Sequence, residues 1–311
     1  MSGEGARAAG AKGRPAGAGD TRAAGTPRPA SAGVVRCDVC PRRCALAPGQ
    51  LGFCRARRNG GGLVRPEGYG RVTSLALDPV EKKPLARWHP GSLVMSVGGY
   101  GCNLRCPWCQ NWEIAQAGAG DVPWQDVSPA ELVALTQKRR RHDPRVVGIA
   151  YTYNEPLVSW EYVRDGARLA HEAGLACVLV SNGCANEPVM RALAPLVDAA
   201  NIDLKGFAAE AYRTCGGDLA CVRRTLELLV AQDGCHLEVT TLVVPGVSDD
   251  PADMDAEARW LASLDPELTL HVTRFFPCWH MAGRAPTPVA HVHALADVAR
   301  RHLRHVFVGN C

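Results

Sequence analysis

The chain of 311 residues has no long apolar segment and little excess charge of either sign. No run approaches the roughly 18 apolar residues of a membrane-spanning helix. No stretch of about 7–15 apolar residues follows the N-terminus, as a secretory signal would require. We therefore expect a cytoplasmic protein with no membrane partner. The net charge is +4, of which residues 1–33 contribute +3. The remaining body is close to neutral, which argues against a broad nucleic-acid-binding surface.

Large apolar side chains are also missing from residues 1–33, which consist almost entirely of Ala, Gly, Arg, Pro, Ser and Thr. Burial cannot offset the entropy cost of ordering such a segment, so we predict a disordered tail. An organellar transit peptide is the alternative for a segment with few acidic residues. Its low serine content and the lack of an amphipathic stripe argue against that alternative.

Cysteine, in contrast, is abundant, with 14 residues in the chain. This number is well below the density of a disulfide scaffold and is high for a protein of a reducing compartment. Metal-bound thiolates are the simpler explanation for several of them. Six others show no paired spacing and are expected to be small buried residues; these are Cys177, Cys184, Cys215, Cys221, Cys235 and Cys278.

Three cysteines, Cys102, Cys106 and Cys109, stand in the spacing C-x₃-C-x₂-C. Three thiolates on one tight loop suit three corners of a [4Fe–4S] cluster and leave the fourth iron without a protein ligand. A structural zinc site usually has four protein ligands, and disulfide pairing would leave one thiol over. The spacing therefore predicts a cluster with one open iron. A zinc site that borrows a ligand from elsewhere is the alternative.

A second group of cysteines lies in a lead-in segment, residues 34–91. Four thiols fall within eighteen residues that are punctuated by Gly and Pro turns, which predicts a closed metal site. Structural zinc and a second iron–sulfur cluster both fit the spacing. The four residues are Cys37, Cys40, Cys44 and Cys54.

From Ser92 onward, strand and helix patterns alternate. Ser128 begins a capping box with Pro at the first helical position, and a helix over residues 161–173 is expected to end at Gly174. Repeated strand–helix units predict an α/β fold, a partial (β/α)₆-type parallel barrel over residues 92–311 with a cysteine-rich N-terminal extension. Chemistry gathers at the carboxyl ends of such strands. The expected strands are Leu93–Val97, Val146–Tyr151, Ala176–Ser181, Ala199–Leu204, Leu237–Val244, Leu268–Phe276 and Val306–Val308.

The C-x₃-C-x₂-C spacing, with Trp108 directly before the last cysteine, resembles the cluster loop of the radical S-adenosylmethionine (SAM) enzymes. The resemblance implies a radical SAM fold in which SAM chelates the open iron. It also implies that an electron from the cluster splits SAM, giving a 5′-deoxyadenosyl radical that abstracts hydrogen from a substrate. The cofactor supplies this chemistry, and the protein supplies position and exclusion of water.

The segments after the second and third strands resemble SAM contacts of the same enzymes. Asn154 and Glu155 precede Pro156 where that family has Gly-Gly-Glu-Pro, which implies that this turn meets the SAM amino group. An ordinary polar turn is the alternative. Asn182, between Ser181 and Gly183, resembles the segment near the SAM ribose or carboxylate, although Asn-Gly is also a common turn signal.

The fourth and sixth strands carry three further candidates. Asp203 and Lys205 resemble the Asp-x-Lys of pyruvate formate-lyase activating enzymes, which implies that the lysine faces the SAM carboxylate. His271 resembles a strand histidine that contacts the nucleoside in those enzymes. A structural Asp–Lys pair and a core histidine are the alternatives, because ionic groups at the end of a buried strand need partners.

Longer strings resemble the radical SAM enzymes of the AmmeMemoRadiSam system, relatives of the pyruvate formate-lyase activating enzymes. This resemblance implies Memo-type and AMMECR-type partners, a reductant such as flavodoxin or ferredoxin, and an activase that makes a glycyl radical as one option for the substrate. The strings are Asp78–Leu85, Gly101–Trp112, Tyr151–Pro156, Asn201–Gly206 and Thr287–Pro288.

Two other classes of function fit parts of the sequence. An iron–sulfur electron carrier or redox-sensing interaction protein would use the cluster cysteines, but it would not need SAM contacts on four separate strands. An RNA-modifying radical SAM enzyme would need an RNA-binding surface, and the chain shows neither an appended RNA-binding domain nor much excess positive charge.

Overall fold

The computed structural model describes residues 33–311, so the predicted tail lies almost entirely outside the described residues. An eight-stranded sheet organises the molecule in the order β14-β13-β12-β11-β10-β9-β7-β6, and only the β6–β7 pair is antiparallel. The predicted parallel sheet is therefore confirmed. The strands are β6 Ser74–Pro79, β7 Leu93–Gly98, β9 Val146–Tyr151, β10 Ala176–Ser181, β11 Ala199–Asp203, β12 His236–Val243, β13 Thr269–Arg274 and β14 His305–Gly309.

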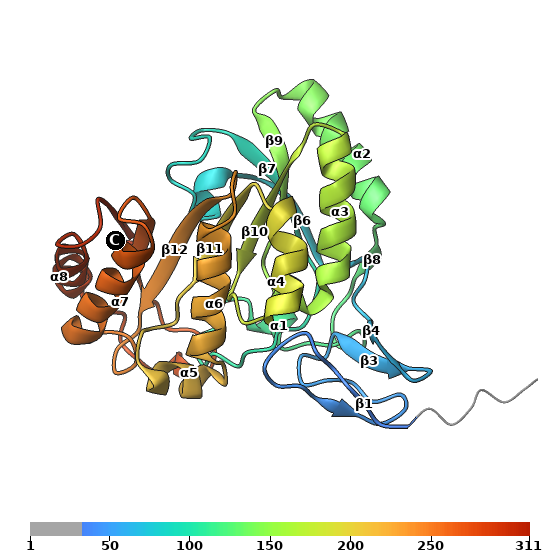
Figure 1. Ribbon diagram of the computed structural model, residues 1–311, viewed down its shortest axis with the longest axis horizontal. Coiled ribbons are helices and arrows are strands. Elements are labelled where there is room, and N and C mark those ends of the chain that lie inside the picture. The colour runs from blue at the N-terminus through green and yellow to red at the C-terminus, as the bar shows by residue number, and fades with distance from the viewer. Residues whose placement is uncertain (1–32) are drawn as a thin grey trace, which may run out of the picture.

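Helices connect the parallel strands and cover the outer face of the curved sheet (Figure 1). This is the partial barrel that the sequence predicts. Among residues 33–311, no helix is long and apolar enough to cross a membrane. The helices are α1 Trp112–Ala115, α2 Pro129–His142, α3 Trp160–Glu172, α4 Glu187–Leu193, α5 Ala209–Cys215, α6 Leu219–Val230, α7 Pro251–Leu264 and α8 Val289–Ala299, with the 3₁₀ turns η1 Val80–Lys82, η2 Pro156–Ser159, η3 Ala194–Leu196 and η4 Trp279–Met281.

Local signals place several element ends within one or two residues of the prediction. The Ser128 side chain accepts the Glu131 amide at the start of α2, and the Glu131 carboxylate bonds back to the Ser128 amide. This is the reciprocal arrangement that satisfies two free helix-end donors. Gly174, just after α3, takes a φ of +66°, which glycine adopts at little cost.

The inner face of the sheet is closed at the amino ends of its strands by the segment before β7. Val80, Leu85 and Trp88 pack there against small and β-branched strand residues, which include Val94 and Val178. The outer face packs its larger apolar side chains under the helices. Apolar side chains thus fill the barrel at the amino ends of its strands. The polar side chains nearer the carboxyl ends of the strands remain available for a ligand.

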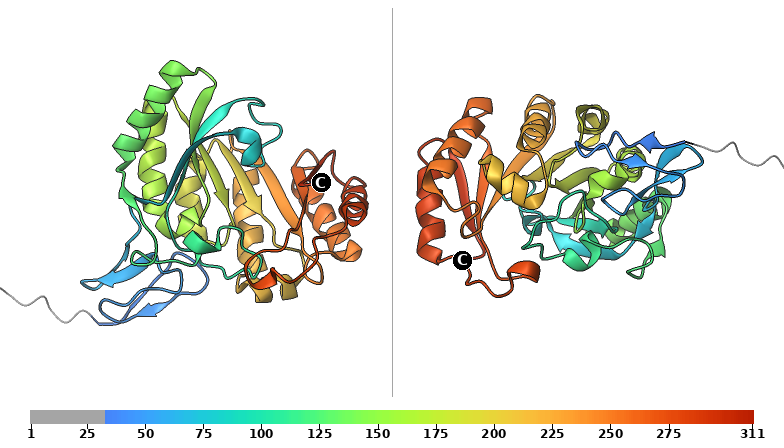
Figure 2. Two further views of the ribbon diagram at one scale, coloured as in Figure 1. Left: turned by 180° about the vertical axis from the view of Figure 1, so that it is seen from behind. Right: turned by 90° about the horizontal axis from the view of Figure 1, so that it is seen from below.

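The cysteine-bearing part of the lead-in, residues 34–66, lies at the carboxyl ends of the strands beside α1, whereas η1, at the end of the lead-in, lies at the opposite end of the sheet (Figures 1 and 2). The small antiparallel pairs are β1 with β2, β3 with β4, and β5 with β8. Residues of the predicted lead-in also enter the large sheet, because β6 pairs with β7. The bounds of the small strands are β1 Val35–Arg36, β2 Ala45–Leu46, β3 Arg57–Gly60, β4 Leu63–Pro66, β5 Arg71–Val72 and β8 Gln125–Asp126.

Candidate functional site

The cluster loop, residues 99–111, follows β7 directly at the carboxyl edge of the sheet. It is fixed at its start by Asn154, whose Oδ1 accepts the Gly99 amide at 3.0 Å. The Asn154 amide also donates to the carbonyls of Tyr100 and Gly101, each at 3.1 Å. Gly101 has a φ of +87°, and a side chain there would overlap the Cys54 carbonyl. The loop therefore depends on glycine at this position.

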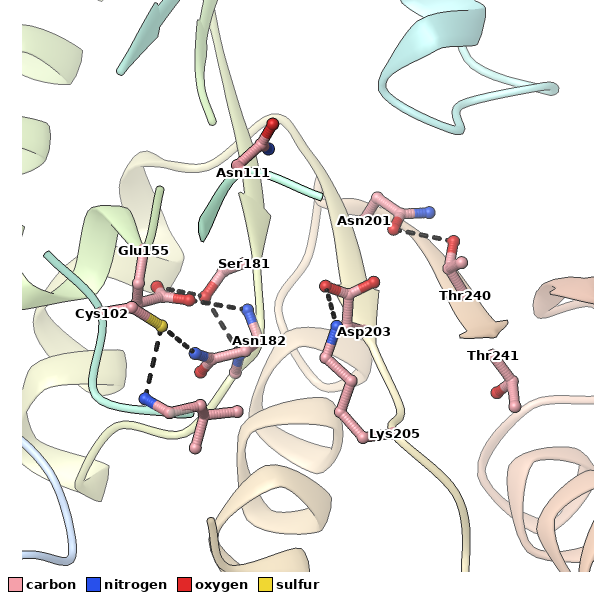
Figure 3. A network of polar contacts seen from close by, with 12 residues as sticks. Cys102, Asn111, Glu155, Ser181, Asn182, Asn201, Asp203, Lys205, Thr240 and Thr241 are labelled. Atoms are coloured by element: carbon pink, nitrogen blue, oxygen red, sulfur yellow. Dashed lines mark hydrogen bonds and ion pairs between the residues drawn. The ribbon is translucent and has the colours of Figure 1, made fainter. Parts of the chain in front are cut away.

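The three loop thiols are at least partly buried, and Cys106 is the most buried, with 9% of its surface exposed. The Cys102 sulfur accepts the Leu104 amide at 3.3 Å and lies 3.6 Å from Asn182 Nδ2 (Figure 3). Backbone and side-chain N–H groups around a cysteine sulfur are the setting of iron–sulfur ligands, because such bonds tune the cluster. The donor set thus fits a cluster with three cysteine ligands.

No group of three or more His, Cys, Asp or Glu side chains within residues 33–311 is arranged to hold a single metal ion. This applies to the loop thiols and to the lead-in thiols alike. Metal binding to such thiols releases their protons, because the thiolate is the ligand.

Two further thiols adjoin the loop, and sequence reasoning missed both. The Cys215 thiol, at the end of α5, hydrogen-bonds to the Cys106 sulfur, which lowers the pKa of Cys106 and raises that of Cys215. The Cys278 thiol points to the Cys109 carbonyl at 3.5 Å. Because these contacts join residues more than 100 positions apart, no local spacing signals them. The prediction that Cys215 is buried is correct, but its neighbour is a candidate cluster ligand.

Glu155 ties the end of β9 to the end of β10. Its carboxylate accepts the Leu157 amide at 2.9 Å, the Ser181 hydroxyl at 2.7 Å and the Asn182 amide at 2.8 Å (Figure 3). Only 2% of Glu155 is exposed, and burial raises its pKa to about 7 despite these bonds. The carboxylate thus already holds a bridging position within the site.

Tyr153 and Asn154 replace the two glycines of the resembling motif, and both side chains have structural partners. Tyr153 takes a φ of +70°, which is strained for a non-glycine residue. Its phenol donates to Asp78 Oδ2 at 2.6 Å, and its carbonyl accepts Asn111 Nδ2 at 2.7 Å. Gly98 gives it room, since a Cβ there would lie 2.9 Å from the Tyr153 Cβ. The turn is therefore attached to the cluster loop by side chains.

Strand register brings three polar residues into one row on the inner face. Asp203 pairs with Thr240, and Thr240 pairs with His271. Lys205, just beyond β11, places Nζ 2.8 Å from Asp203 Oδ2 (Figure 3). Burial opposes the charge on Lys205, but Asp203 and the neighbouring Cys106 raise its pKa above the usual value. The ammonium therefore stays charged beside the cluster loop.

His271 already has a partner within the barrel. Its Nε2 lies 2.5 Å from Glu238 Oε2, and Glu238 also accepts the amides of Ala86 and Arg87 at 3.0 and 2.8 Å. Burial opposes ionisation of Glu238, but these bonds and one from His236 outweigh it and lower its pKa to about 2. Sequence reasoning missed Glu238, which joins the barrel floor to the predicted nucleoside contact.

Trp108 is also buried, with 4% of its surface exposed, and it belongs to the main hydrophobic core. The four lead-in cysteines line one cavity, whose wall includes Asn103 from the cluster loop. Burial raises the pKa of the Cys40 and Cys54 thiols to about 11, so both are protonated in the metal-free protein.

Solved structures with the same fold include radical SAM proteins. A radical SAM methyltransferase from Sphaerobacter thermophilus aligns with a TM-score of 0.53 at 16% identity, over 70% of this chain and 66% of that one. SuiB of Streptococcus suis, in a structure with bound S-adenosylmethionine, aligns with a TM-score of 0.54 at 10% identity, over 70% of this chain and 52% of that one. At these identities the likeness concerns the fold.

Sequence relatives point the same way. An uncharacterized protein of Methanocaldococcus jannaschii is 37% identical over 274 residues, which are 88% of this chain and 80% of that protein. The pyruvate formate-lyase 1-activating enzyme of Escherichia coli is 27% identical over 155 residues, 48% of this chain and 61% of that enzyme. The family model described as the radical SAM superfamily matches residues 96–258, just over half of the chain. The sequence match, the fold and the position of the cysteine loop together establish that the chain belongs to the radical SAM superfamily.

Proposed function

We propose that Cys102, Cys106 and Cys109 hold a [4Fe–4S] cluster with one open iron, and that SAM binds this iron over the carboxyl ends of β9–β13. Superfamily membership implies that the bound cluster and SAM supply reductive cleavage to a 5′-deoxyadenosyl radical, which takes hydrogen from a substrate. The observation that carries the residue assignment is the position of the three thiols. They share one loop after β7, and one of their sulfurs contacts Asn182 just beyond β10, which is separated from β7 in the sheet by β9.

In this proposal the polar residues around the loop orient SAM. Lys205 faces the SAM carboxylate, because its ammonium is held at the strand end by Asp203 and has further N–H donors to offer. Asn182 lies between the Cys102 sulfur and the ends of the strands, where it contacts the ribose or the methionyl group. The backbone of the turn from Tyr153 to Glu155 meets the SAM amino group.

Other residues hold these groups in place and exclude water. His271 contacts the nucleoside, and Glu238 fixes the orientation of its ring. Trp108 anchors the cluster loop in the core. The packed segment that contains Val80, Leu85 and Trp88 closes the barrel below and keeps water from entering at that end.

We assign this chemistry to residues 92–311, with the lead-in over residues 34–91 as an accessory segment. Similarity to a pyruvate formate-lyase 1-activating enzyme supports hydrogen abstraction from a protein glycine as the substrate reaction. The electron comes from a reductant such as flavodoxin or ferredoxin. The motif strings support a place in the AmmeMemoRadiSam system, with Memo-type and AMMECR-type proteins as partners.

The assignment of the cluster ligands is tested by SAM cleavage without a substrate. Protein reconstituted anaerobically with iron and sulfide is given dithionite and SAM, and 5′-deoxyadenosine is measured. Wild-type protein is expected to form it, and Cys109→Ala is expected to lose it. Cys177→Ala, which alters a buried cysteine on β10, serves as the matched control and should retain it. Full turnover in Cys109→Ala would refute the ligand assignment.

The activase hypothesis needs a separate test. The reconstituted enzyme, SAM and reductant are mixed with a Memo-type or AMMECR-type protein, and the sample is frozen for electron paramagnetic resonance. A glycyl radical signal on the added protein that requires SAM would support the hypothesis. Stoichiometric SAM cleavage coupled to that protein without any glycyl radical would direct attention to another carbon–hydrogen bond.

A further inference from the structure

The four lead-in cysteines, which lie up to seventeen positions apart in the chain, converge on one cavity. A Cβ on Gly52 would lie 3.8 Å from the Cys54 sulfur and 3.9 Å from the Cys44 sulfur. Cys37 and Cys40 line the same cavity, and the Cys37 amide bonds to the Cys44 carbonyl at 2.9 Å. All four thiols therefore border one cavity, and four cysteine ligands are the donor set of a closed metal centre.

The buried guanidinium group of Arg57, in the wall of this cavity, has one N–H donor without a partner within residues 33–311. Arg57 is only 4% exposed and lines the thiol cavity. Its two terminal nitrogens bind the Glu161 carboxylate at 2.7 and 2.9 Å, and one of them also binds the Val158 carbonyl. Its Nε–H has no partner among the described residues. An unsatisfied buried donor costs about 1–3 kcal/mol, and thiolate or sulfide sulfur in the cavity would accept its hydrogen bond.

The side chain of Asn103, a residue of the cluster loop, forms part of the wall of this cavity. It is 3% exposed, and it lines the cavity beside Cys40. Its Oδ1 accepts Asn182 Nδ2 at 2.9 Å, and that same nitrogen lies 3.6 Å from the Cys102 sulfur. A continuous polar path thus runs from the lead-in thiols through Asn103 and Asn182 to a candidate ligand of the SAM cluster.

Two arginines attach the lead-in to the cluster loop beside this path. Arg42 Nε donates to the Asn103 carbonyl at 2.9 Å, and an Arg105 terminal nitrogen donates to the Phe53 carbonyl at 2.7 Å. Both guanidinium groups also lie over the Phe53 ring, at 3.4 and 4.1 Å from its centroid. The relative position of the two thiol groups is therefore fixed by contacts from both sides.

We propose that Cys37, Cys40, Cys44 and Cys54 hold a second iron–sulfur cluster that passes electrons to the SAM cluster. The inference rests on the proposed function, because it needs a SAM cluster at Cys102, Cys106 and Cys109 to receive the electron. Four cysteine ligands complete the coordination of a [4Fe–4S] cluster, so this centre has no open iron and transfers electrons only.

The electron balance of the proposed relay is simple. A one-electron donor of the flavodoxin or ferredoxin class is oxidised as the lead-in cluster is reduced. The lead-in cluster is then reoxidised as it reduces the SAM cluster, and no atom is transferred. Assembly of the centre releases the thiol protons, and the resulting sulfur charge is placed beside Arg57.

The existence of the second cluster is tested in a variant that lacks the first. The full chain with Cys102→Ala, Cys106→Ala and Cys109→Ala is reconstituted anaerobically, and iron, sulfide and zinc are counted. We expect about four iron atoms per chain in this variant and about eight in the wild type. Adding Cys37→Ala and Cys44→Ala should remove the remaining iron, with circular dichroism to show that the chain stays folded. A folded triple variant that binds zinc in preference to iron, or no metal, would overturn the proposal.

The relay is tested by comparing two reductants. In Cys37→Ala with Cys44→Ala, the rate of SAM cleavage with reduced flavodoxin is divided by the rate with dithionite. We expect this ratio to fall by about tenfold or more relative to the wild type, on the scale seen when groups around a metal centre are removed. An unchanged ratio would exclude the relay. Loss of SAM cleavage with both reductants in the wild type would instead contradict the proposed function, and the iron count of the triple variant separates that failure from this one.

Discussion

Single side chains, rather than glycines, hold the turn after β9 against the cluster loop. Asn154 supplies three hydrogen bonds to the backbone of residues 99–101. Tyr153 accepts a strained φ so that its ring can reach Asp78 beneath the site. The two motif positions that are glycines in the resembling family are therefore occupied here by side chains. These side chains fix the loop that carries the three thiols.

Replacing Asn154 should loosen that loop. Asn154→Ala leaves the Gly99 amide and the Tyr100 carbonyl without their partner, and each unsatisfied buried group costs about 1–3 kcal/mol. The Gly101 carbonyl loses one of its two donors and keeps the Glu155 amide. We expect a lower unfolding free energy in urea and less iron retained after anaerobic gel filtration. Gln232→Ala, which removes an exposed bond to the Asp233 carbonyl, is the control and should retain its iron. Equal iron retention in both variants would contradict the anchoring role.

Whole elements are fixed by signals at their ends and by the groups they bury. Helix α2 begins with a complete capping box at Ser128 and Glu131. Helix α7 buries Glu257 against β12, where the Thr241 hydroxyl donates to its carboxylate. The buried carboxyl group of Glu257 makes stability depend on pH.

The capping box should contribute measurably to stability. Ser128→Ala removes the acceptor for the Glu131 amide and is expected to lower the unfolding free energy by about 1 kcal/mol. Urea denaturation followed by circular dichroism measures this difference. Ser263→Ala on α7 removes a hydroxyl that bonds only to a carbonyl of its own helix, so it should change stability less. A larger loss of unfolding free energy in Ser263→Ala than in Ser128→Ala would show that α2 does not depend on its cap.

We predict that deprotonation of the buried Glu257 lowers the unfolding free energy of the protein as the pH rises. Burial raises its pKa from the usual 4.5 to about 8, so the folded state binds the proton more tightly than the unfolded state. The stabilisation from the protonated form is complete below about pH 4.5 and is lost as the pH rises through 8. Glu257→Gln should therefore gain stability relative to the wild type between these limits, on the order of 5 kcal/mol at the upper end.

Thermal unfolding at pH 5 and pH 9 measures this change. The difference in melting temperature between Glu257→Gln and the wild type should be larger and more favourable at pH 9. Glu172→Gln, at an exposed position of α3, is the control and should show no such trend. A pH-independent difference for Glu257→Gln would mean that the carboxyl group stays protonated, or stays ionised, across the whole range.

At the scale of the molecule, the cysteine-bearing part of the lead-in, residues 34–66, meets the barrel at the proposed SAM site. It lies against the carboxyl ends of the strands, and the opposite end is closed by the segment around η1 (Figure 1). Phe53 lies between Arg42 and Arg105 at this junction. Under the proposed function, access to SAM is therefore shaped by this part of the lead-in as well as by the loops of the barrel.

Removing the Phe53 ring should loosen the lead-in without unfolding the barrel. Each cation–π contact at an exposed site contributes about 0.5–1 kcal/mol, so Phe53→Ala should cost roughly 1–2 kcal/mol. Limited proteolysis should then cleave faster within residues 34–66. Phe276→Ala, which removes an exposed ring that lies under Arg274 and follows β13, is the matched control. Equal cleavage rates would show that the junction is held by other contacts.

The sequence by itself determined the parallel α/β fold, several element boundaries and the radical SAM family. The predicted strands over 146–151 and 176–181 match β9 and β10, because runs of buried β-branched residues and flanking turns are local signals. The cap at Ser128 was predictable for the same reason. The C-x₃-C-x₂-C spacing identified the cluster loop, since three thiols within eight residues need no tertiary information to be found together.

Only the tertiary structure decided which distant groups meet. It placed Glu238 against His271, Cys215 against Cys106, and Glu161 against Arg57. It also placed Asn103 between the two groups of cysteines. These contacts join residues that are often more than 30 positions apart, and they arise from strand register and loop packing. No spacing along the chain encodes such contacts, because the parallel sheet brings the carboxyl ends of its strands to one edge regardless of their distance in sequence.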